Sequence, residues 1–204
     1  MSYMISRQKF LSAKEARRLQ RVAKRMARKD AANGKTTWVT RFMLIHLALN
    51  TGLRVSEIAA LKIGDLHFNG AENYLIVQKG KGGKTRTVYL DSGIVAHLKR
   101  YVGMKQKWGE PVDEDLPLLS GRGGNHYTTT ALHISFKKAV EQANLPRHFS
   151  VHCCRHTYAT LLLARSRNLR FVQKQLGHSS IAMTSLYADV LPELNQKLAE
   201  TILK

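Results

Sequence analysis

The stretch YLIVQKGKGGKTRTVYL, residues 74–90, decides the fold class that we expect for this chain. Its two ends, Tyr74–Val77 and Thr85–Leu90, have the alternating pattern of half-buried strands. Between them lies a glycine-rich, basic turn from Gly80 to Lys84, so the stretch predicts a β-hairpin. Asp65–Phe68 is expected to add a third strand beside this hairpin.

The rest of the chain has helical periodicity. Ser12 and Glu15 are spaced as a capping box at the start of a helix, and Asn33-Gly34 ends that helix. Residues 108–124 hold two prolines and an acidic cluster, and are expected to form a mobile surface connection. We therefore predict an α+β fold, mostly α, with a small three-stranded antiparallel sheet packed on helices. Further helices are expected near residues 36–50, 55–61, 91–105, 129–144, 152–165, 169–176, 181–188 and 193–203.

The charge balance indicates a polyanionic partner. The 204 residues include 33 Lys and Arg against 14 Asp and Glu, a net charge of +19 that attracts nucleic acid or an anionic membrane surface. A membrane is not expected, because the longest apolar stretch, residues 42–49, is too short to span one. The two cysteines, Cys153 and Cys154, are adjacent, which is typical of reduced thiols in a cytoplasmic protein.

Two motifs resemble sites that their surroundings do not support. Gly83-Lys84-Thr85 has the end of a phosphate-binding P-loop, but that motif needs glycine at position 78, which is Gln78. His152 and His156 are spaced like zinc ligands, but Cys153 stands where a zinc protease has glutamate, and no second ligand pair is evident. We therefore expect no metal and no cofactor.

Six side chains that could bind or attack a phosphate are spread along the sequence, and each alone has an ordinary structural interpretation. Together, their local contexts resemble the tyrosine recombinase (phage integrase) family, in the right order over residues 10–190. The matching segments are TGLRVSE (51–57), GKGGKTR (80–86), HCCRHT (152–157) and LGHSS (176–180), with Tyr187 nine residues after His178. The six side chains are Arg54, Lys81, His152, Arg155, His178 and Tyr187.

This resemblance implies a site-specific DNA recombinase that cleaves and rejoins strands through a 3′-phosphotyrosine at Tyr187, without metal or ATP. Arg54 and Arg155 would neutralise the phosphate, as paired guanidinium hydrogen bonds can. Lys81 would protonate the leaving 5′-oxygen, with the neighbouring Lys79 and Lys84 as rivals for that role.

The remaining predicted site residues are two histidines and a glutamate. His152 would take the tyrosine or hydroxyl proton, and His178 would donate a hydrogen bond to a non-bridging oxygen. Glu57 would orient an arginine or histidine. Two alternatives stay open: type IB topoisomerase-like nicking and resealing, and a basic DNA-binding regulator without catalysis.

Phosphate contacts are expected mainly from the basic first helix. The helix near 129–144 would either read a DNA groove or be a surface amphipathic helix packed through Leu132, Phe136 and Val140. The predicted DNA-binding residues are Arg17, Arg18, Arg21, Lys24, Arg25, Lys84, Arg86, Lys137 and Lys138.

We expect residues 1–204 to form a single catalytic domain, without the separate N-terminal core-binding domain of the family. It would comprise an arm (1–10), a catalytic core (11–190) and a C-terminal helix (191–204) of the kind that often docks on a neighbouring protomer. The implied partners are double-stranded DNA, further copies of the chain as dimers to tetramers on DNA, and possibly an accessory DNA-bending protein. The protein would be a monomer in solution, cytoplasmic, and of phage, plasmid or bacterial origin.

Overall fold

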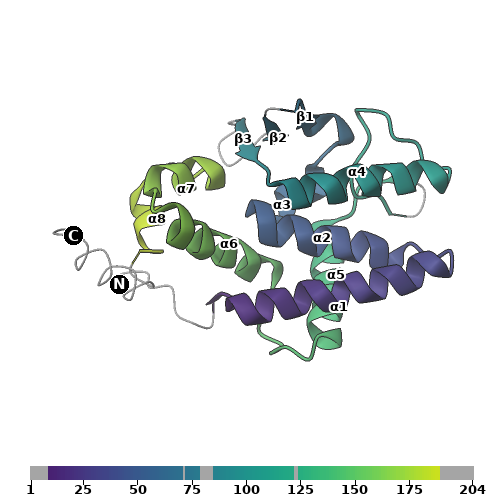
Figure 1. The fold of residues 1–204 in the computed structure, drawn as a ribbon, viewed down its shortest axis with the longest axis horizontal. Coiled ribbons are helices and arrows are strands. Elements are labelled where there is room, and N and C mark those ends of the chain that lie inside the picture. Colours follow the sequence, from purple (N-terminus) through teal and green to yellow (C-terminus); the bar gives the residue numbers. More distant parts are fainter. Residues whose placement is uncertain (1–8, 71, 79–84, 122–123, 189–204) are drawn as a thin grey trace.

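The computed structural model describes residues 9–70, 72–78, 85–121 and 124–188. Within them, a small sheet lies above a layer of helices, and further helices extend to one side (Figure 1). The elements are α1 (Ala13–Ala32), α2 (Thr37–Thr51), α3 (Val55–Ala60), η2 (Ile63–Asp65), β1 (Leu66–Phe68), β2 (Asn73–Val77), β3 (Arg86–Tyr89), α4 (Ser92–Lys107), α5 (Thr129–Gln142), α6 (Val151–Ser166), α7 (Leu169–Leu176) and α8 (Ala182–Ser185).

The predicted fold class is confirmed by the sheet. Its strands run antiparallel in the order β1-β2-β3, with Leu75 of β2 paired to Leu66 on one side and to Val88 on the other. Leu75 and Val88 are fully buried, so the inner face of the sheet packs on the helices. The central turn of the hairpin, with Lys81 and Lys84, lies outside the described residues.

The long helices α1 and α2 form the main core. The first has one buried stripe, Ala16, Leu19, Ala23 and Ala27, and packs that stripe on α2. The second is buried on most of its circumference, because α1, α4, α5 and α6 surround it. The predicted capping box is confirmed, since Glu15 accepts a hydrogen bond from the Ser12 amide at 2.7 Å while Ser12 Oγ accepts from the Glu15 amide at 3.2 Å.

The predicted mobile connection after α4 is instead anchored along much of its length. Leu118 and Leu119 are buried, and the Leu118 amide donates to the Leu61 carbonyl at 2.8 Å. The ammonium of Lys105, itself buried, donates to Glu110 and to Ser120. This arrangement could not be predicted from the sequence, because a buried lysine near the end of a helix gives no local signal for its partners.

The helices α6, α7 and α8 build a second, smaller core around Ala159, Leu163, Val172, Leu176 and Tyr187. The helix predicted for 181–188 is shorter, since α8 ends at Ser185 and the chain turns through the following residues. The predicted C-terminal helix near 193–203 lies outside the described residues. No helix among the described residues is long and apolar enough to cross a bilayer.

Candidate active site

The junction of α2 and α3 sets the position of the first arginine. Gly52 ends α2 at φ +63°, in the left-handed region that favours glycine. A Cβ on Gly52 would lie 2.5 Å from Cδ1 of Tyr158 on α6, so the backbone and α6 are in direct contact here. This turn brings Arg54 to the start of α3, facing the same space as Glu57 one turn later.

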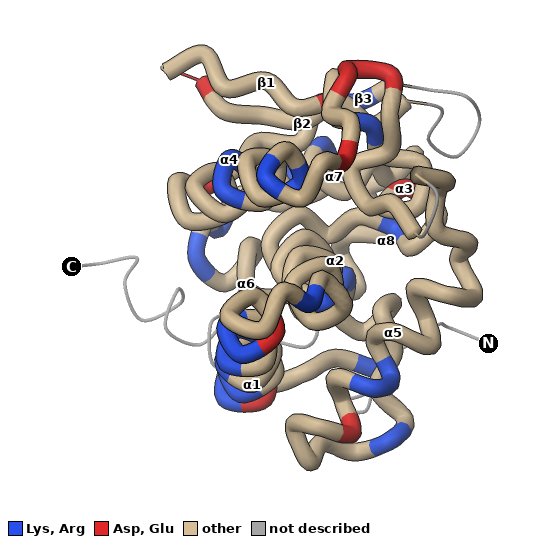
Figure 2. Tube along the Cα trace, turned by 90° about the vertical axis from the view of Figure 1, so that its right-hand side faces the viewer, with Lys and Arg blue, Asp and Glu red and all other residues tan. Residues whose placement is uncertain are grey.

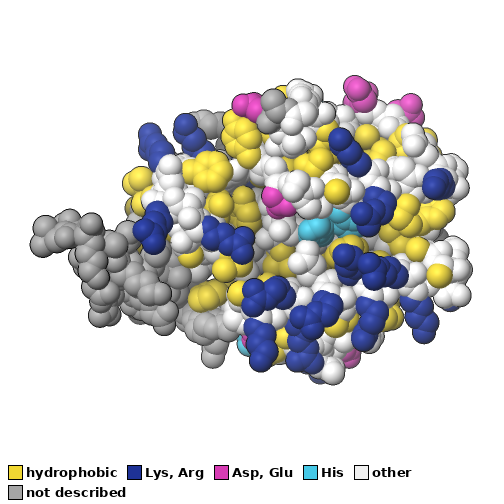
Figure 3. Space-filling view, viewed as in Figure 1, with side chains coloured by type: hydrophobic (Ala, Val, Ile, Leu, Met, Phe, Trp, Pro, Cys, Tyr) yellow, Lys and Arg dark blue, Asp and Glu magenta, His cyan; other side chains and the backbone are white. Residues whose placement is uncertain are grey.

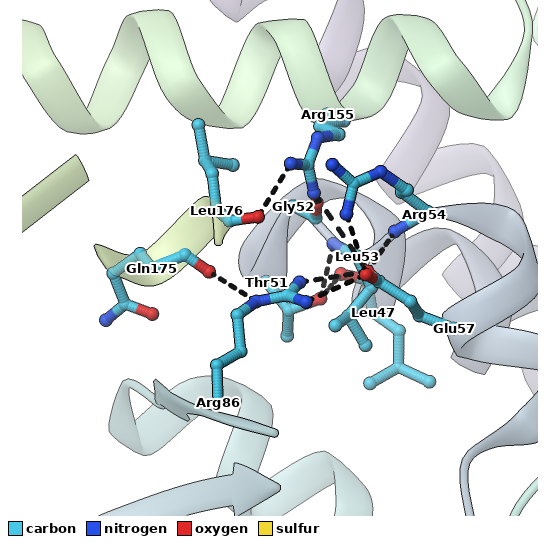
Figure 4. Close-up of polar contacts among 10 residues, drawn as sticks. All are labelled: Leu47, Thr51, Gly52, Leu53, Arg54, Glu57, Arg86, Arg155, Gln175 and Leu176. Atoms are coloured by element: carbon cyan, nitrogen blue, oxygen red, sulfur yellow. Dashed lines mark hydrogen bonds and ion pairs between the residues drawn. The ribbon is translucent and has the colours of Figure 1, made fainter. Parts of the chain in front are cut away.

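Three arginines surround the buried carboxylate of Glu57 (Figure 4). Arg86 donates from both terminal nitrogens, at 2.8 and 2.9 Å, and Arg54 Nη1 donates at 2.9 Å. Arg155 Nη1 lies 4.0 Å from the same carboxylate. Burial alone would raise the pKa of Glu57, but the hydrogen bonds and charge of Arg86, helped by Arg54 and Arg155, lower it to about 2. The carboxylate therefore stays ionised and holds the arginines in place.

Arg155 is the most deeply buried of these three cations. Its side chain is buried, and it donates to the Gly52 carbonyl and to the Leu176 carbonyl, both at 2.7 Å (Figure 4). Burial, followed by the charge of Arg54, lowers its pKa to about 10, which still leaves it fully charged at neutral pH. Arg155 thus ties α6 to the ends of α2 and α7 while keeping further N–H donors for a ligand.

The end of α7 closes the cluster from the other side. Gly177 has φ +65°, and a Cβ there would lie 2.5 Å from Cδ of Arg86. The Arg86 Nε donates to the Gln175 carbonyl at 3.2 Å. This close approach explains the glycine before His178, because any side chain at that position would displace an arginine that holds Glu57.

The predicted nucleophile and the second histidine lie together. The rings of His178 and Tyr187 are stacked with centroids 6.2 Å apart, and His178 Nδ1 is 2.9 Å from Thr184 Oγ1. Tyr187 is only 2% exposed. Burial and the charges of Arg155, Arg54 and Arg86 lower the pKa of His178 to about 4, so its ring is neutral at pH 7 and Nε2 is the nitrogen left for a phosphate oxygen.

His156, which we did not predict as a site residue, contacts the nucleophile. Its Nδ1 lies 3.0 Å from the Tyr187 hydroxyl. Burial and the charges of His152, Arg155 and Lys9 lower its pKa to about 4. The predicted partner, His152, is exposed and meets His156 edge-on, with ring centroids 4.6 Å apart. The sequence did contain a signal for His156 as a site residue: it follows Arg155 directly and lies one helical turn after His152.

Two of the predicted DNA-binding side chains also make hydrogen bonds within the protein. The Arg86 guanidinium is paired with Glu57, and the Lys137 ammonium donates to the carbonyls of Arg147 and Phe149. Lys138 is exposed, as are the predicted cations of the first helix, Arg17, Arg18, Arg21, Lys24 and Arg25. In the described part of the chain, no group of three or more His, Cys, Asp or Glu side chains is placed to hold a metal ion.

The cluster has the charge to bind a phosphodiester. Three guanidinium groups against one carboxylate leave two uncompensated positive charges at Arg54, Arg86 and Arg155. A phosphodiester carries one negative charge and gains a second as a nucleophile adds to phosphorus. Fixed N–H donors that face this developing charge are the usual means of lowering such a barrier. The geometry therefore suits phosphoryl transfer to a tyrosine hydroxyl.

The comparison with known families agrees with this chemistry. Residues 9–193 match the family model described as the phage integrase family. The chain belongs to the phage integrase family. Among its relatives in this family, tyrosine recombinase XerC of Bradyrhizobium diazoefficiens is 32% identical over 172 residues, covering 82% of the chain and 52% of the relative. XerC of Neisseria meningitidis serogroup B is 36% identical over 144 residues, covering 71% of the chain and 46% of the relative.

Solved structures of phage integrase family members share the fold. XerA recombinase superimposes with a TM-score of 0.76 at 25% identity, covering 100% of the chain and 67% of that protein. XerH recombinase in a post-cleavage complex with palindromic difH substrate gives a TM-score of 0.76 at 26% identity, covering 96% of the chain and 53% of that protein. The chain thus spans about half the length of the curated relatives it matches.

Proposed function

We propose that this chain is the catalytic domain of a site-specific tyrosine recombinase, which cleaves and rejoins DNA through a covalent bond to Tyr187. The observation that carries this proposal is that the Tyr187 hydroxyl lies 3.0 Å from a histidine nitrogen. The Tyr187 ring is stacked with that of His178 and lies close to the buried Arg155. A DNA-binding regulator needs cations, but it has no use for a tyrosine hydroxyl beside neutral histidines.

In the cleavage step, the Tyr187 oxygen attacks phosphorus and the bond from phosphorus to the 5′-oxygen breaks. The product is a 3′-phosphotyrosine and a free 5′-hydroxyl. The phenol proton passes to a neutral imidazole, and the contact at 3.0 Å makes His156 the nearest described acceptor. Rejoining is the reverse reaction with a new 5′-hydroxyl, so the phosphotyrosine conserves the bond energy and ATP is not required.

Arg54 and Arg155 would bind the non-bridging oxygens with their remaining N–H groups. His178, held by Thr184 at Nδ1, would donate from Nε2 to one of these oxygens. Glu57 fixes the guanidinium planes in advance, which keeps the reorganisation energy low when charge develops. Lys81, which follows β2 and precedes β3 in the sequence, would give the leaving 5′-oxygen its proton.

We extend the proposal to the assembled protein. Site-specific exchange joins two duplexes, so two to four copies of the chain would act together on double-stranded DNA. In solution, without DNA, the chain would be a monomer. XerH, a relative of similar fold, has been solved on a palindromic substrate, which is the symmetry that a pair of protomers requires. Residues 191–204 would link neighbouring protomers, and a DNA-bending protein would act as an accessory.

The target sequence can be found by selection. The chain is incubated with duplexes of randomised sequence that carry a central nick, and DNA that stays attached to protein in detergent is amplified and sequenced. Two copies of the selected site are then placed on a supercoiled plasmid, with Tyr187→Phe as control. Recombinant circles that form with the wild type, persist in chelator and vanish with Tyr187→Phe are the expected result. Relaxation without recombinants would instead identify a topoisomerase, and binding without either product a regulator.

A further inference from the structure

The first helix presents an almost uninterrupted cationic surface. Eight of its side chains are exposed Lys or Arg, and we call them the α1 basic face: Lys14, Arg17, Arg18, Arg21, Lys24, Arg25, Arg28 and Lys29. The two acids of α1 offset only two of these eight charges, which leaves the helix at +6. Glu15 is engaged in the capping box, and Asp30 accepts a hydrogen bond from the Trp38 amide at 2.8 Å.

The basic surface continues onto α4. Lys99, Arg100 and Lys107 of that helix are exposed. Burial, followed by the charges of His46, Arg100 and Lys24, lowers the pKa of His97 to about 3, so one cation of each helix lies near enough to act on this histidine. Figure 3 shows the result, with Lys and Arg side chains spread over α1 and α4 and histidine atoms between them.

This surface points away from the catalytic cluster. Figure 2 shows α1 and α4 on one side of the molecule and α3 and α8 on the other, with α2 between them. α1 packs on α2 through its alanine and leucine stripe, so its cations face outward, while Arg54 and Glu57 lie at the start of α3. α2 lies between α1 and α3, so at about 8–10 Å between neighbouring helix axes the middle of α1 is roughly 20 Å from α3, although the chain at the start of α1 contacts α6 through Leu11 and Thr157. A straight duplex that lies against the catalytic cluster would therefore not reach the α1 basic face.

The spacing of the cations suits the backbone of duplex DNA. Arg17, Arg21, Lys24 and Arg28 follow one another at helical spacing and form one stripe. The stripe is roughly 16 Å long at 1.5 Å per residue. Over that length a duplex carries about 10 phosphate charges, counting both strands. These are cations on flexible stems along a helix, so they would contact phosphates without reading sequence.

We propose that the α1 basic face, together with Arg100 and Lys107 of α4, binds a second segment of double-stranded DNA while the catalytic site holds the first. The interaction is electrostatic and independent of sequence. It would let one protein molecule bring two duplexes together before exchange. The inference concerns binding alone, and it holds or fails whether or not Tyr187 forms a covalent bond.

The test counts duplexes on single molecules. The full chain is attached to a surface through a biotin at its N-terminus, at a density that keeps the molecules apart. A mixture of red and green 16-base-pair duplexes is then added. Wild-type molecules should show both colours at once. The variant that removes the stripe should bind one duplex and lose the two-colour signal at least tenfold, with its melting temperature unchanged. That variant is Arg17→Gln, Arg21→Gln, Lys24→Gln and Arg28→Gln.

A control variant loses the same charge elsewhere, through Arg147→Gln, Arg167→Gln, Arg170→Gln and Lys174→Gln, all exposed, outside α1 and α4, and not among the predicted DNA-binding residues. It should keep the two-colour signal. In bulk titrations, the binding constant is measured at several salt concentrations. The slope of log binding constant against log salt concentration should be shallower by about 3 to 4 for the stripe variant, because each of the four lost phosphate contacts contributes about 0.9.

Three outcomes would overturn the proposal. If both variants lose two-colour binding equally, net charge alone explains the effect. If the stripe variant loses the first duplex as well, α1 binds the same DNA as the catalytic site. If wild-type molecules that hold one duplex capture a labelled polyglutamate in preference to a second duplex, the surface is built for an acidic protein.

Discussion

Replacing Glu57 by glutamine should destabilise the fold by roughly 3 kcal/mol. The substitution keeps the shape of the side chain and removes the charge that holds Arg54 and Arg86. A carboxyl whose pKa falls from 4.5 to about 2 on folding stabilises the folded state at neutral pH by roughly 3 kcal/mol, at 1.36 kcal/mol for each tenfold change in proton affinity. The Glu57 side chain is 6% exposed, so solvent screens this little.

The sign of the pH dependence follows from the lowered pKa. Stabilisation by Glu57 is fully present above pH 4.5 and is lost as the pH falls toward 2. Glu57→Gln should abolish that part of the acid sensitivity and lower the melting temperature by roughly 6–12 °C at pH 7, for a domain of this size.

The measurement is thermal and urea unfolding, followed by circular dichroism between pH 3 and pH 8. Glu72→Gln serves as the matched control, because that glutamate is exposed and its loss should change stability by less than about 0.5 kcal/mol. If Glu57→Gln is as stable as this control at pH 7, the carboxylate does not hold the arginine cluster and the reasoning fails.

Three further predictions each rest on a single substitution elsewhere in the chain. Gly52→Ala should destabilise the chain by at least about 2 kcal/mol and abolish cleavage, because it meets both a positive φ and α6 at 2.5 Å, whereas Gly70→Ala, with positive φ but open space, should cost about 1 kcal/mol. His97, with its pKa lowered to about 3, should make the fold less stable as the pH drops below 6.5, by up to about 3 kcal/mol near pH 4, and His97→Phe should flatten that slope in urea titrations. His156→Asn should slow single-turnover cleavage by roughly 10²–10⁴, and more than His152→Asn does; the opposite order would return the proton-accepting role to His152.

The fold could be predicted because its signals are local. The alternation in residues 74–90 and the Ser12–Glu15 capping box each depend on residues within a few positions of one another, and both are confirmed. The anchored connection after α4 could not be foreseen, because it depends on a buried Lys105 meeting Ser120 15 residues later. Periodicity identifies a buried face, but it does not identify the partner of a single buried charge.

The candidate site was predicted through motifs, and its geometry comes from the fold. Sequence predicted Arg86 as a DNA-binding cation but did not predict that its guanidinium is paired with Glu57, 29 residues earlier. A basic residue beside a glycine-rich turn predicts phosphate contact, but its carboxylate partner is known only once its neighbours in space are known. The side of the molecule on which α1 presents its cations could not be predicted from the sequence either. Helical spacing shows which residues share a face, but not the direction in which that face points.

The attachment point of DNA tests the central claim most directly. After incubation with the selected nicked duplex, the protein–DNA adduct is isolated in detergent, digested with nuclease and trypsin, and sequenced by tandem mass spectrometry. Trypsin should release residues 175–197 as one peptide, in which Tyr187 is the sole tyrosine. We predict a phosphonucleotide on Tyr187, linked through the 3′ end of the DNA. A nucleotide on another residue, or linked through the 5′ end, would contradict the account.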